Sequence, residues 1–401
     1  MRLDTTSRST SGLSHAGLRR VLIVLSVTEI TSWGVLYYAF AVLAPSISAS
    51  EGWSAAEITA AFSAGQITMA VIGIPVGRRL DRHGPRGVMT AGSVLAAPAV
   101  VAIATAPNLA WFVAGWILAG VAMSGVLYVP AFAALTRWYG PRRIGALTVL
   151  TLVAGLASTV FAPLTAALVG PLDWRTTYLV LAVLLAVVTV PAHWWGLRGP
   201  WPSAPERRTG GHAPATIVRS RAFLALGAAF TLAAFTTFAV LIHVVPLLLE
   251  RGVDQGVAAV ALGLGGAGQV LGRLGYGRID RRFGVRIRTV LVLLAIAVTT
   301  ASIAVLSSPV ALIVAVVVAG MARGVFTLLH ATAITDRWGS ADYGRLTGIL
   351  SAPLTATIAL APWAGAVLAG ALGGYPAMFL VLAGLAAMAT ALALASTPTW
   401  R

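Results

Sequence analysis

Twelve long apolar stretches dominate this chain of 401 residues and limit what it can fold into. Each is about 20 residues or longer, which is the length that an α-helix needs to cross the hydrocarbon core of a bilayer. The stretches are too long, and alternate too little, to be strands of a transmembrane barrel. We therefore predict an all-α integral membrane protein with twelve transmembrane helices, over residues 20–44, 56–78, 87–106, 109–136, 143–169, 175–196, 221–249, 256–278, 288–307, 309–335, 344–371 and 375–396.

The two halves of the chain repeat each other at an offset of 200 residues. The repeated pairs are Gly84 and Gly284, Arg86 and Arg286, Gly120 and Gly320, Arg137 and Arg337, Trp138 and Trp338, and Ser54 and Asp254. Ser54 and Asp254 are residue types that cap the start of a helix. Such a repeat indicates two pseudo-symmetric six-helix bundles with a site between them near the membrane midplane. We predict an N-terminal bundle over 1–196, a polar cytoplasmic linker over 197–220 and a C-terminal bundle over 221–401.

Arginine supplies the whole basic excess of the chain, which contains no lysine. The 28 basic and 12 acidic residues give a formal net charge of +16, which on its own would suggest a nucleic acid or another anionic surface as partner. When the N-terminus is placed in the cytoplasm, however, the arginines concentrate in the cytoplasmic segments. We therefore expect a multi-pass protein of the plasma (cytoplasmic) membrane with both termini in the cytoplasm, and no nucleic-acid partner. The four arginines elsewhere are Arg175, Arg251, Arg273 and Arg323.

The loop after the second predicted helix contains a conspicuous pattern of glycine and charged residues. It reads Gly77-Arg-Arg-Leu-Asp81-Arg82-His-Gly84-Pro-Arg86. This pattern resembles the G-x-x-x-D-R-x-G-x-R signature of the major facilitator superfamily, and the loop at 277–286 resembles it with altered spacing. The resemblance implies the twelve-helix major facilitator fold, transport by alternating access, and signature loops that hold the two halves together, the alternative being solvated charged loops. The candidate gating residues are Asp81, Arg82, Arg86, Asp280 and Arg281.

Further features are similar to one branch of this superfamily. They are Glu29 before Trp33-Gly34 in the first helix, Trp138-Tyr139 and Arg142-Arg143 at the start of the fifth, and Arg273 in the eighth. They resemble the branch of the monocarboxylate transporters and oxalate/formate antiporters. In that branch an arginine of the eighth helix binds the substrate carboxylate, which implies this role for Arg273. The chain departs from the branch because Gln269 replaces the acid that often lies one turn before this arginine, and because no lysine is present to act as a partner.

Two arginines lie inside predicted spans, where a charge at the helix centre costs at least ~2.5–3.5 kcal/mol. Arg273 lies seven residues before Asp280, about 10 Å along the helix, so it could line a central cavity or extend to the cytoplasmic surface. Arg323 lies thirteen residues before Asp336, about 20 Å, which favours lining a cavity over a structural ion pair. Because a guanidinium binds a carboxylate through two hydrogen bonds, both are candidate ligands of an anionic substrate.

Candidate proton carriers and aromatic ligands complete the predicted site. Glu29 is the only carboxylate well inside a span. It is the leading carrier if transport is proton-coupled, because arginine cannot release its proton; the alternative is a fixed counter-ion or an interhelical hydrogen bond. His243 and His330 follow, although a single membrane histidine is more often a hydrogen-bonded packing residue. The aromatic candidates for substrate contact, which could also be packing or interface residues, are Trp33, Tyr37, Tyr38 and Tyr128.

These residues together support a hypothesis about function. We expect a secondary active transporter that moves a small, carboxylate-like organic anion by alternating access, either coupled to protons or by exchange. The alternative is a proton-coupled drug or metabolite exporter of the same superfamily, although the Gly-Pro motif of such exporters is imperfect at Ala162-Pro163. An enzyme is not expected, because the chain lacks a His-Glu-x-x-His motif, cysteine and a nucleophile cluster. We expect no cofactor, no metal, and a functional monomer in a bacterial membrane, with the lipid bilayer, the anion and a proton as partners.

Overall fold

The chain is predominantly helical over the residues that the computed structural model describes, which are 13–201, 214–339 and 343–397, and no β-strand occurs in these ranges. Twelve segments are long and apolar enough to cross a membrane, which confirms the predicted number. Helices satisfy their backbone groups internally, as the hydrocarbon core requires. The elements are α1 (His15–Trp33), η1 (Gly34–Tyr38), α2 (Ala39–Glu51), α3 (Ala55–His83), α4 (Pro85–Ala104), α5 (Leu109–Val126), α6 (Tyr128–Tyr139), η2 (Gly140–Arg142), α7 (Arg143–Ala154), α8 (Ala157–Val169), α9 (Trp174–Gly196), α10 (Pro214–Val218), α11 (Arg221–Glu250), α12 (Gln255–Arg282), α13 (Val285–Val305), α14 (Pro309–Thr332), α15 (Thr335–Trp338), α16 (Tyr343–Leu372) and α17 (Tyr375–Ala393).

Capping residues set several helix boundaries. The Glu57 amide donates to the Ser54 hydroxyl at 3.2 Å, and the Ser54 amide donates to the Glu57 carboxylate at 2.8 Å, so a capping box opens α3. The Asp254 carboxylate accepts backbone amides at the start of α12 in the other half. The first span is longer than predicted, because Ser14 caps α1 and Gly52 ends α2 in a left-handed conformation with φ 72°.

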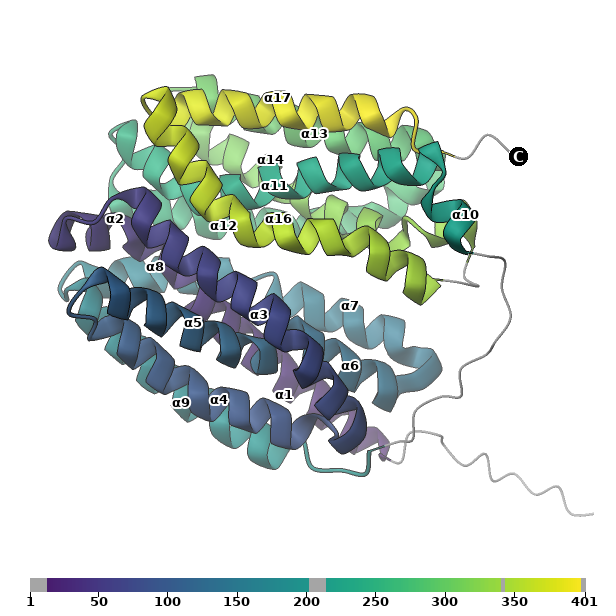
Figure 1. Cartoon of the computed structure of the whole chain (residues 1–401), viewed down its shortest axis with the longest axis horizontal. Coiled ribbons are helices and arrows are strands. Elements are labelled where there is room, and N and C mark those ends of the chain that lie inside the picture. The colour runs from purple at the N-terminus through teal and green to yellow at the C-terminus, as the bar shows by residue number, and fades with distance from the viewer. Residues whose placement is uncertain (1–12, 202–213, 340–342, 398–401) are drawn as a thin grey trace, which may run out of the picture.

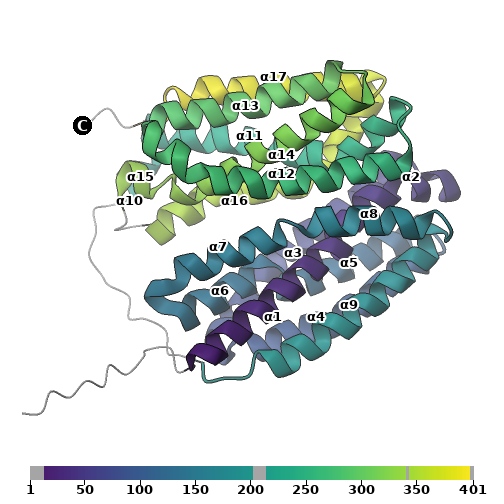
Figure 2. The same ribbon diagram turned by 180° about the vertical axis from the view of Figure 1, so that it is seen from behind.

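Figures 1 and 2 show two groups of helices lying side by side, one formed by α1–α9 and the other by α10–α17. These are the two pseudo-symmetric bundles of the predicted fold. They meet where α3 packs on α16, α8 on α12 and α2 on α11. The start of α1, the short helix α10 and the end of α17 lie at one end of the molecule (Figure 1). The arginine-rich loops after α3 and α12 lie at this end as well, and we call it the arginine-rich end.

Pairs of glycines lie at equivalent helix crossings in the two halves of the sequence repeat. A Cβ atom on Gly120 would meet the carbonyl oxygen of Gly65 where α5 crosses α3, and a Cβ atom on Gly320 would meet that of Gly265 where α14 crosses α12. The two pairs are themselves 200 residues apart. Small residues let helix backbones approach closely in a membrane. The offset in the sequence therefore reflects the same helix crossing built once in each bundle.

The two bundles differ in how continuous their helices are. In the N-terminal half, the first span contains the π-helix η1, the fourth breaks at Leu127 between α5 and α6, and the fifth breaks at Gly155 and Leu156 between α7 and α8. At the equivalent positions of the other half, α11, α14 and α16 are continuous, although the chain has a turn at Ala333 and Ile334 between α14 and α15. The deformations therefore occur in the bundle that supplies the predicted aromatic residues.

Candidate functional site

Aromatic side chains of the N-terminal bundle form one cluster with arginines of the C-terminal bundle. The ring centroids of Trp33 and Tyr37 are 5.3 Å apart, those of Trp33 and Tyr128 are 5.0 Å apart, and those of Tyr37 and Tyr38 are 5.5 Å apart. These separations are typical of aromatic pairs in contact. Tyr37 interacts electrostatically with Arg323, and Tyr38 and Tyr128 with Arg273. The aromatic–arginine cluster consists of Trp33, Tyr37, Tyr38, Tyr128, Arg273 and Arg323.

The π-helix η1 presents the aromatic side of this cluster. A π-helix is rare and is frequently found at functional sites. It begins at Gly34, where the Phe161 ring of α8 occupies the place that a Cβ atom would take. Tyr37 in η1 is only 1% exposed, and its hydroxyl has no hydrogen-bond partner among the described residues. Since a buried polar group without a partner is costly, this hydroxyl is a ready donor or acceptor for a ligand.

Arg273 belongs to α12 of the C-terminal bundle, but its guanidinium contacts the N-terminal bundle. Its Nη1 donates a hydrogen bond to the Thr151 carbonyl oxygen in the last turn of α7, and the Tyr128 hydroxyl lies within hydrogen-bonding reach. Gly155 leaves room for this contact, because a Cβ atom there would be 3.1 Å from Nη1. Arg273 is 8% exposed, so the side chain does not extend to the surface at the arginine-rich end. A cation at the C-terminal end of a helix is also favoured by the helix dipole.

Arg323 lies on α14 and is held from within its own bundle. Its Nη2 donates a hydrogen bond to the Gln269 side-chain oxygen at 2.8 Å, while its Nε has no partner in the described ranges. Arg323 is 9% exposed and interacts electrostatically with Arg273. Neither arginine forms an ion pair with a carboxylate among the described residues, where the ion pairs involve Arg175 and Arg288 only. The cluster therefore contains two buried positive charges without an acidic partner.

Glu29 lies on α1, one turn before Trp33, and is fully buried. Neither of its carboxylate oxygens has a hydrogen-bond partner in the part of the chain that the structure describes. The Trp33 indole N–H is nearby, but it does not donate a hydrogen bond to either oxygen. The hydroxyls of Ser26 and Ser32, three residues away on either side, are also buried and unpaired. An ionised carboxylate in such surroundings carries an uncompensated desolvation cost of several kcal/mol.

The two histidines that were predicted as proton carriers occupy different environments. His243 interacts through Nε2 with the Pro362 carbonyl oxygen at 2.8 Å and lines a pocket of ≈ 340 Å³ between α2, α3, α11 and α17. His330 contacts the Ser351 hydroxyl at 3.2 Å. Neither contact involves the aromatic–arginine cluster, so the structure does not bring these two predicted carriers to it. Their proposed role in proton transfer stays a prediction.

His193 was not among the predicted site residues. It is fully buried on α9, with Nδ1 at 2.7 Å from the Ser93 hydroxyl and Nε2 at 2.9 Å from the Thr28 hydroxyl. The Thr28 hydroxyl donates to the Val24 carbonyl oxygen. It therefore accepts from His193 Nε2, so both nitrogens of this ring have a partner. The signs of this polar group in the sequence are His193, Thr28 and Ser93 themselves, all inside predicted spans.

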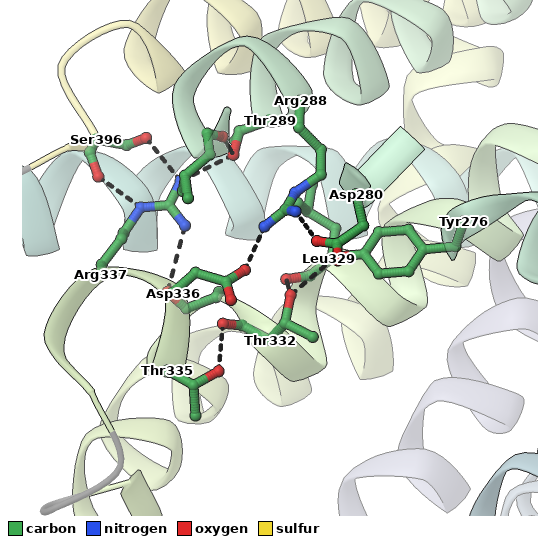
Figure 3. A network of polar contacts seen from close by, with 12 residues as sticks. Tyr276, Asp280, Arg288, Thr289, Leu329, Thr332, Thr335, Asp336, Arg337 and Ser396 are labelled. Atoms are coloured by element: carbon green, nitrogen blue, oxygen red, sulfur yellow. Dashed lines mark hydrogen bonds and ion pairs between the residues drawn. The ribbon is translucent and has the colours of Figure 1, made fainter. Parts of the chain in front are cut away.

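The signature loop of the C-terminal bundle is held by a buried arginine. The Arg288 guanidinium, at the start of α13, pairs with both Asp280 and Asp336 (Figure 3). Next to it, Arg337 donates to the Ser396 carbonyl oxygen at 2.7 Å and to the Thr289 hydroxyl at 2.8 Å. Burial lowers the pKa of the Arg337 guanidinium to about 10, because the charged form loses hydration. This network joins the end of α12, the start of α13, α15 and the residues after α17 at the arginine-rich end.

The N-terminal signature loop has a smaller network of its own. The Arg86 guanidinium lies 4.2 Å from the centroid of the Trp194 ring, and Nε donates to the Trp194 carbonyl oxygen at 2.9 Å. Arg82 and Arg281 are exposed, and the side chain of Asp81 lies outside the described residues. The contacts of Arg86 and of Asp280 each remain within one bundle, so neither residue joins the two halves in this conformation. The gating role stays a prediction.

No group of three or more His, Asp or Glu side chains in the described ranges could hold a metal ion.

A family model described as "Major Facilitator Superfamily" matches residues 25–311 and 224–399 of the chain.

Three known proteins illustrate the similarity. An uncharacterised 38 kDa protein from Thermoproteus tenax is 34% identical over 155 residues, which are 38% of this chain and 40% of that protein. Human monocarboxylate transporter 11 is 30% identical over 225 residues, 55% of this chain and 47% of that protein. The matches thus span less than half the length of either relative. A bacterial homologue of the human lysosomal transporter Spinster, in an inward-facing and unoccupied conformation, superposes with a TM-score of 0.80 over 96% of this chain and 98% of that chain at 15% identity, which shows a shared fold.

Proposed function

This chain belongs to the major facilitator superfamily, and from that membership together with the aromatic–arginine cluster we propose that it is a secondary active transporter of a small organic anion. The anion carries a carboxylate or a similar group. The name of the human relative, a monocarboxylate transporter, supports this class of substrate.

The observation that carries the proposal is the uncompensated charge of Arg273 and Arg323. Both are at least nine-tenths buried, and neither has a carboxylate partner among the described residues. A guanidinium stays charged at any physiological pH, and a buried charge without a partner is unfavourable. An anion that binds between them supplies the missing charge. Trp33 and the tyrosines offer apolar faces and polar tips for the rest of a small organic molecule.

The hydrogen bond between Arg273 and Thr151 supports a link between binding and movement. The partner of Arg273 is a neutral carbonyl oxygen of the opposite bundle. A carboxylate carries the opposite charge and can accept two parallel hydrogen bonds from a guanidinium, whereas the Thr151 carbonyl oxygen is neutral and accepts one. A substrate carboxylate can therefore replace the Thr151 carbonyl, which removes a contact between the bundles. In an alternating-access transporter the two bundles rock against each other around the bound substrate.

Glu29 is the group we assign to proton coupling, if the transport is coupled rather than an exchange of anions. It is a fully buried carboxyl group without a partner, and it lies one turn from Trp33 in the cluster. The orientation and the domain division belong to the same proposal. We place the arginine-rich end in the cytoplasm, the bundles at 1–196 and 221–401, and the linker at 197–220, and we take the single chain as the functional unit.

Flux into proteoliposomes tests the proposal. The purified chain is reconstituted and given a panel of labelled carboxylates, such as acetate, lactate and succinate, with and without a pH gradient. We expect uptake of at least one, and a fall of about tenfold or more for Arg273→Gln and for Arg323→Gln, because a hydrogen bond to a charged group is worth ~1.5–3 kcal/mol. Arg282→Gln, an exposed arginine of the same helix as Arg273, is the matched control. Uptake that both cluster variants leave unchanged would overturn the proposal, and transport of neutral or cationic solutes only would favour an exporter.

A further inference from the structure

A small cavity lies inside the C-terminal bundle, behind the aromatic–arginine cluster. It has a volume of ≈ 40 Å³, and α11, α12, α13 and α14 supply its walls. Most of the wall is aliphatic, and the polar residues that line it are Thr237, Thr299, Thr300 and Arg323. No residue of the N-terminal bundle contributes to this cavity. It is therefore distinct from the space between the bundles, although Arg323 borders both.

Two fully buried hydrogen-bond donors of residues that line this cavity lack partners among the described residues. The Nε of Arg323 and the hydroxyl of Thr237 are buried and form no hydrogen bond with any described residue, and these two residues are 9% and 7% exposed. The Thr299 hydroxyl, in contrast, is already used, because it donates to the Ala295 carbonyl oxygen of its own helix at 2.7 Å. Buried donors are normally satisfied by protein, water or an ion. Both residues line the cavity, so its wall contains one cationic donor and one neutral donor without a partner among the described residues.

The charge and the size of the cavity narrow the choice of occupant. No carboxylate lines it, so the positive charge of Arg323 is uncompensated on this side as well. Pockets for organic ligands usually measure about 300–1,000 Å³, whereas a water needs about 10–15 Å³. A carboxylate with its carbon frame is therefore too large, while a monatomic anion fits. A halide also tolerates the aliphatic walls, because it is round and needs no acceptor of its own.

We propose that this cavity is a halide site, occupied by chloride under physiological conditions, with Arg323 Nε and the Thr237 hydroxyl as donors. The chloride offsets part of the charge of Arg323 from inside the C-terminal bundle, while the charge of Arg273 stays uncompensated. It thereby reduces, without cancelling, the net positive charge that the aromatic–arginine cluster presents to a transported anion. The site can be occupied whether or not the transported solute is an anion.

Thermal unfolding of the purified full-length protein without substrate tests the site. Chloride replaces sulfate, which carries no carboxylate, at constant ionic strength, and we expect the unfolding temperature to rise with chloride concentration as for any ligand of the folded state. Thr237→Val should abolish most of this rise. Thr299→Val, which changes another threonine of the same cavity whose hydroxyl is already used, should retain it. A rise of equal size in Thr237→Val, or no dependence on chloride in the unmodified protein, would overturn the proposal.

A second measurement does not depend on the variants folding well. Crystals of the unmodified chain grown with bromide should show an anomalous peak beside Arg323 Nε, within the cavity of α11–α14. Water alone in the cavity, with bromide absent, would refute the halide site. Because neither experiment contains a transported solute, a failure here leaves the flux experiment on Arg273 to decide the proposed function.

Discussion

Replacing Gly324 by alanine should push α14 away from α12 and disturb Arg323. A Cβ atom at this position would meet the backbone carbonyl oxygen of Gln269, which cannot rotate aside as a flexible side chain would. Gln269 is also the residue whose side chain holds Arg323. The matched control is Gly275→Ala on α12, where an added Cβ atom meets nothing within 4 Å.

The expected size follows from a comparison of the two variants. Both gain about 0.8–1.0 kcal/mol in helix propensity when glycine becomes alanine, so this gain cancels between them. Only Gly324→Ala carries the cost of overpacking, about 1–3 kcal/mol. Thermal unfolding of both variants in one detergent at one scan rate should therefore give a lower unfolding temperature for Gly324→Ala, together with weaker anion binding. Equal unfolding temperatures for the two variants would refute the reasoning about this helix contact.

Three other changes have defined outcomes. Glu29→Gln should remove the response of uptake to a pH gradient while anion exchange persists, measured by flux with and without an imposed gradient; a response that survives would exclude Glu29 as the carrier. Arg288→Met should lower the free energy of unfolding by about 3 kcal/mol. This is the lower end of the cost of breaking a buried ion pair, because the Asp280 side chain is 48% exposed. Arg286→Met, an exposed arginine of the same helix, should change it little, and equal effects would show that the network adds no stability. Because the chain has no cysteine, a membrane-impermeant maleimide applied to intact cells should label Pro107→Cys and leave His83→Cys unlabelled; the reverse result would invert the proposed orientation.

The membrane makes the overall fold of this chain predictable from its sequence. Each span must satisfy its own backbone groups, so length and hydropathy alone locate the helices. The repeat at an offset of 200 residues reports the shared helix crossings at Gly120 and Gly320, because a close backbone approach tolerates only glycine there. The elongation of the first span to Glu51 was missed, since its end depends on the left-handed conformation of Gly52.

The candidate site was only partly predictable. The buried charges and aromatic residues were found because such residues are unusual in a span, and the structure places them together. Their partners could not be predicted, because they depend on how helices distant in the sequence pack. The contact of Arg273 with a backbone carbonyl of Thr151 leaves no trace in side-chain types. The π-helix at Gly34–Tyr38 and the pairing of His193 with Thr28 likewise arise only in the folded bundle.

Binding of matched anionic and neutral ligands tests most directly the claim that Arg273 and Arg323 recognise an anion. Purified protein is screened by thermal unfolding against small carboxylates and against the amides of the same acids, which have nearly the same shape without the charge. We predict that a carboxylate stabilises the protein, that its amide does not, and that Arg273→Gln combined with Arg323→Gln abolishes the effect. Stabilisation by the amide equal to that by the carboxylate, or an undiminished response of the double variant, would contradict the central claim.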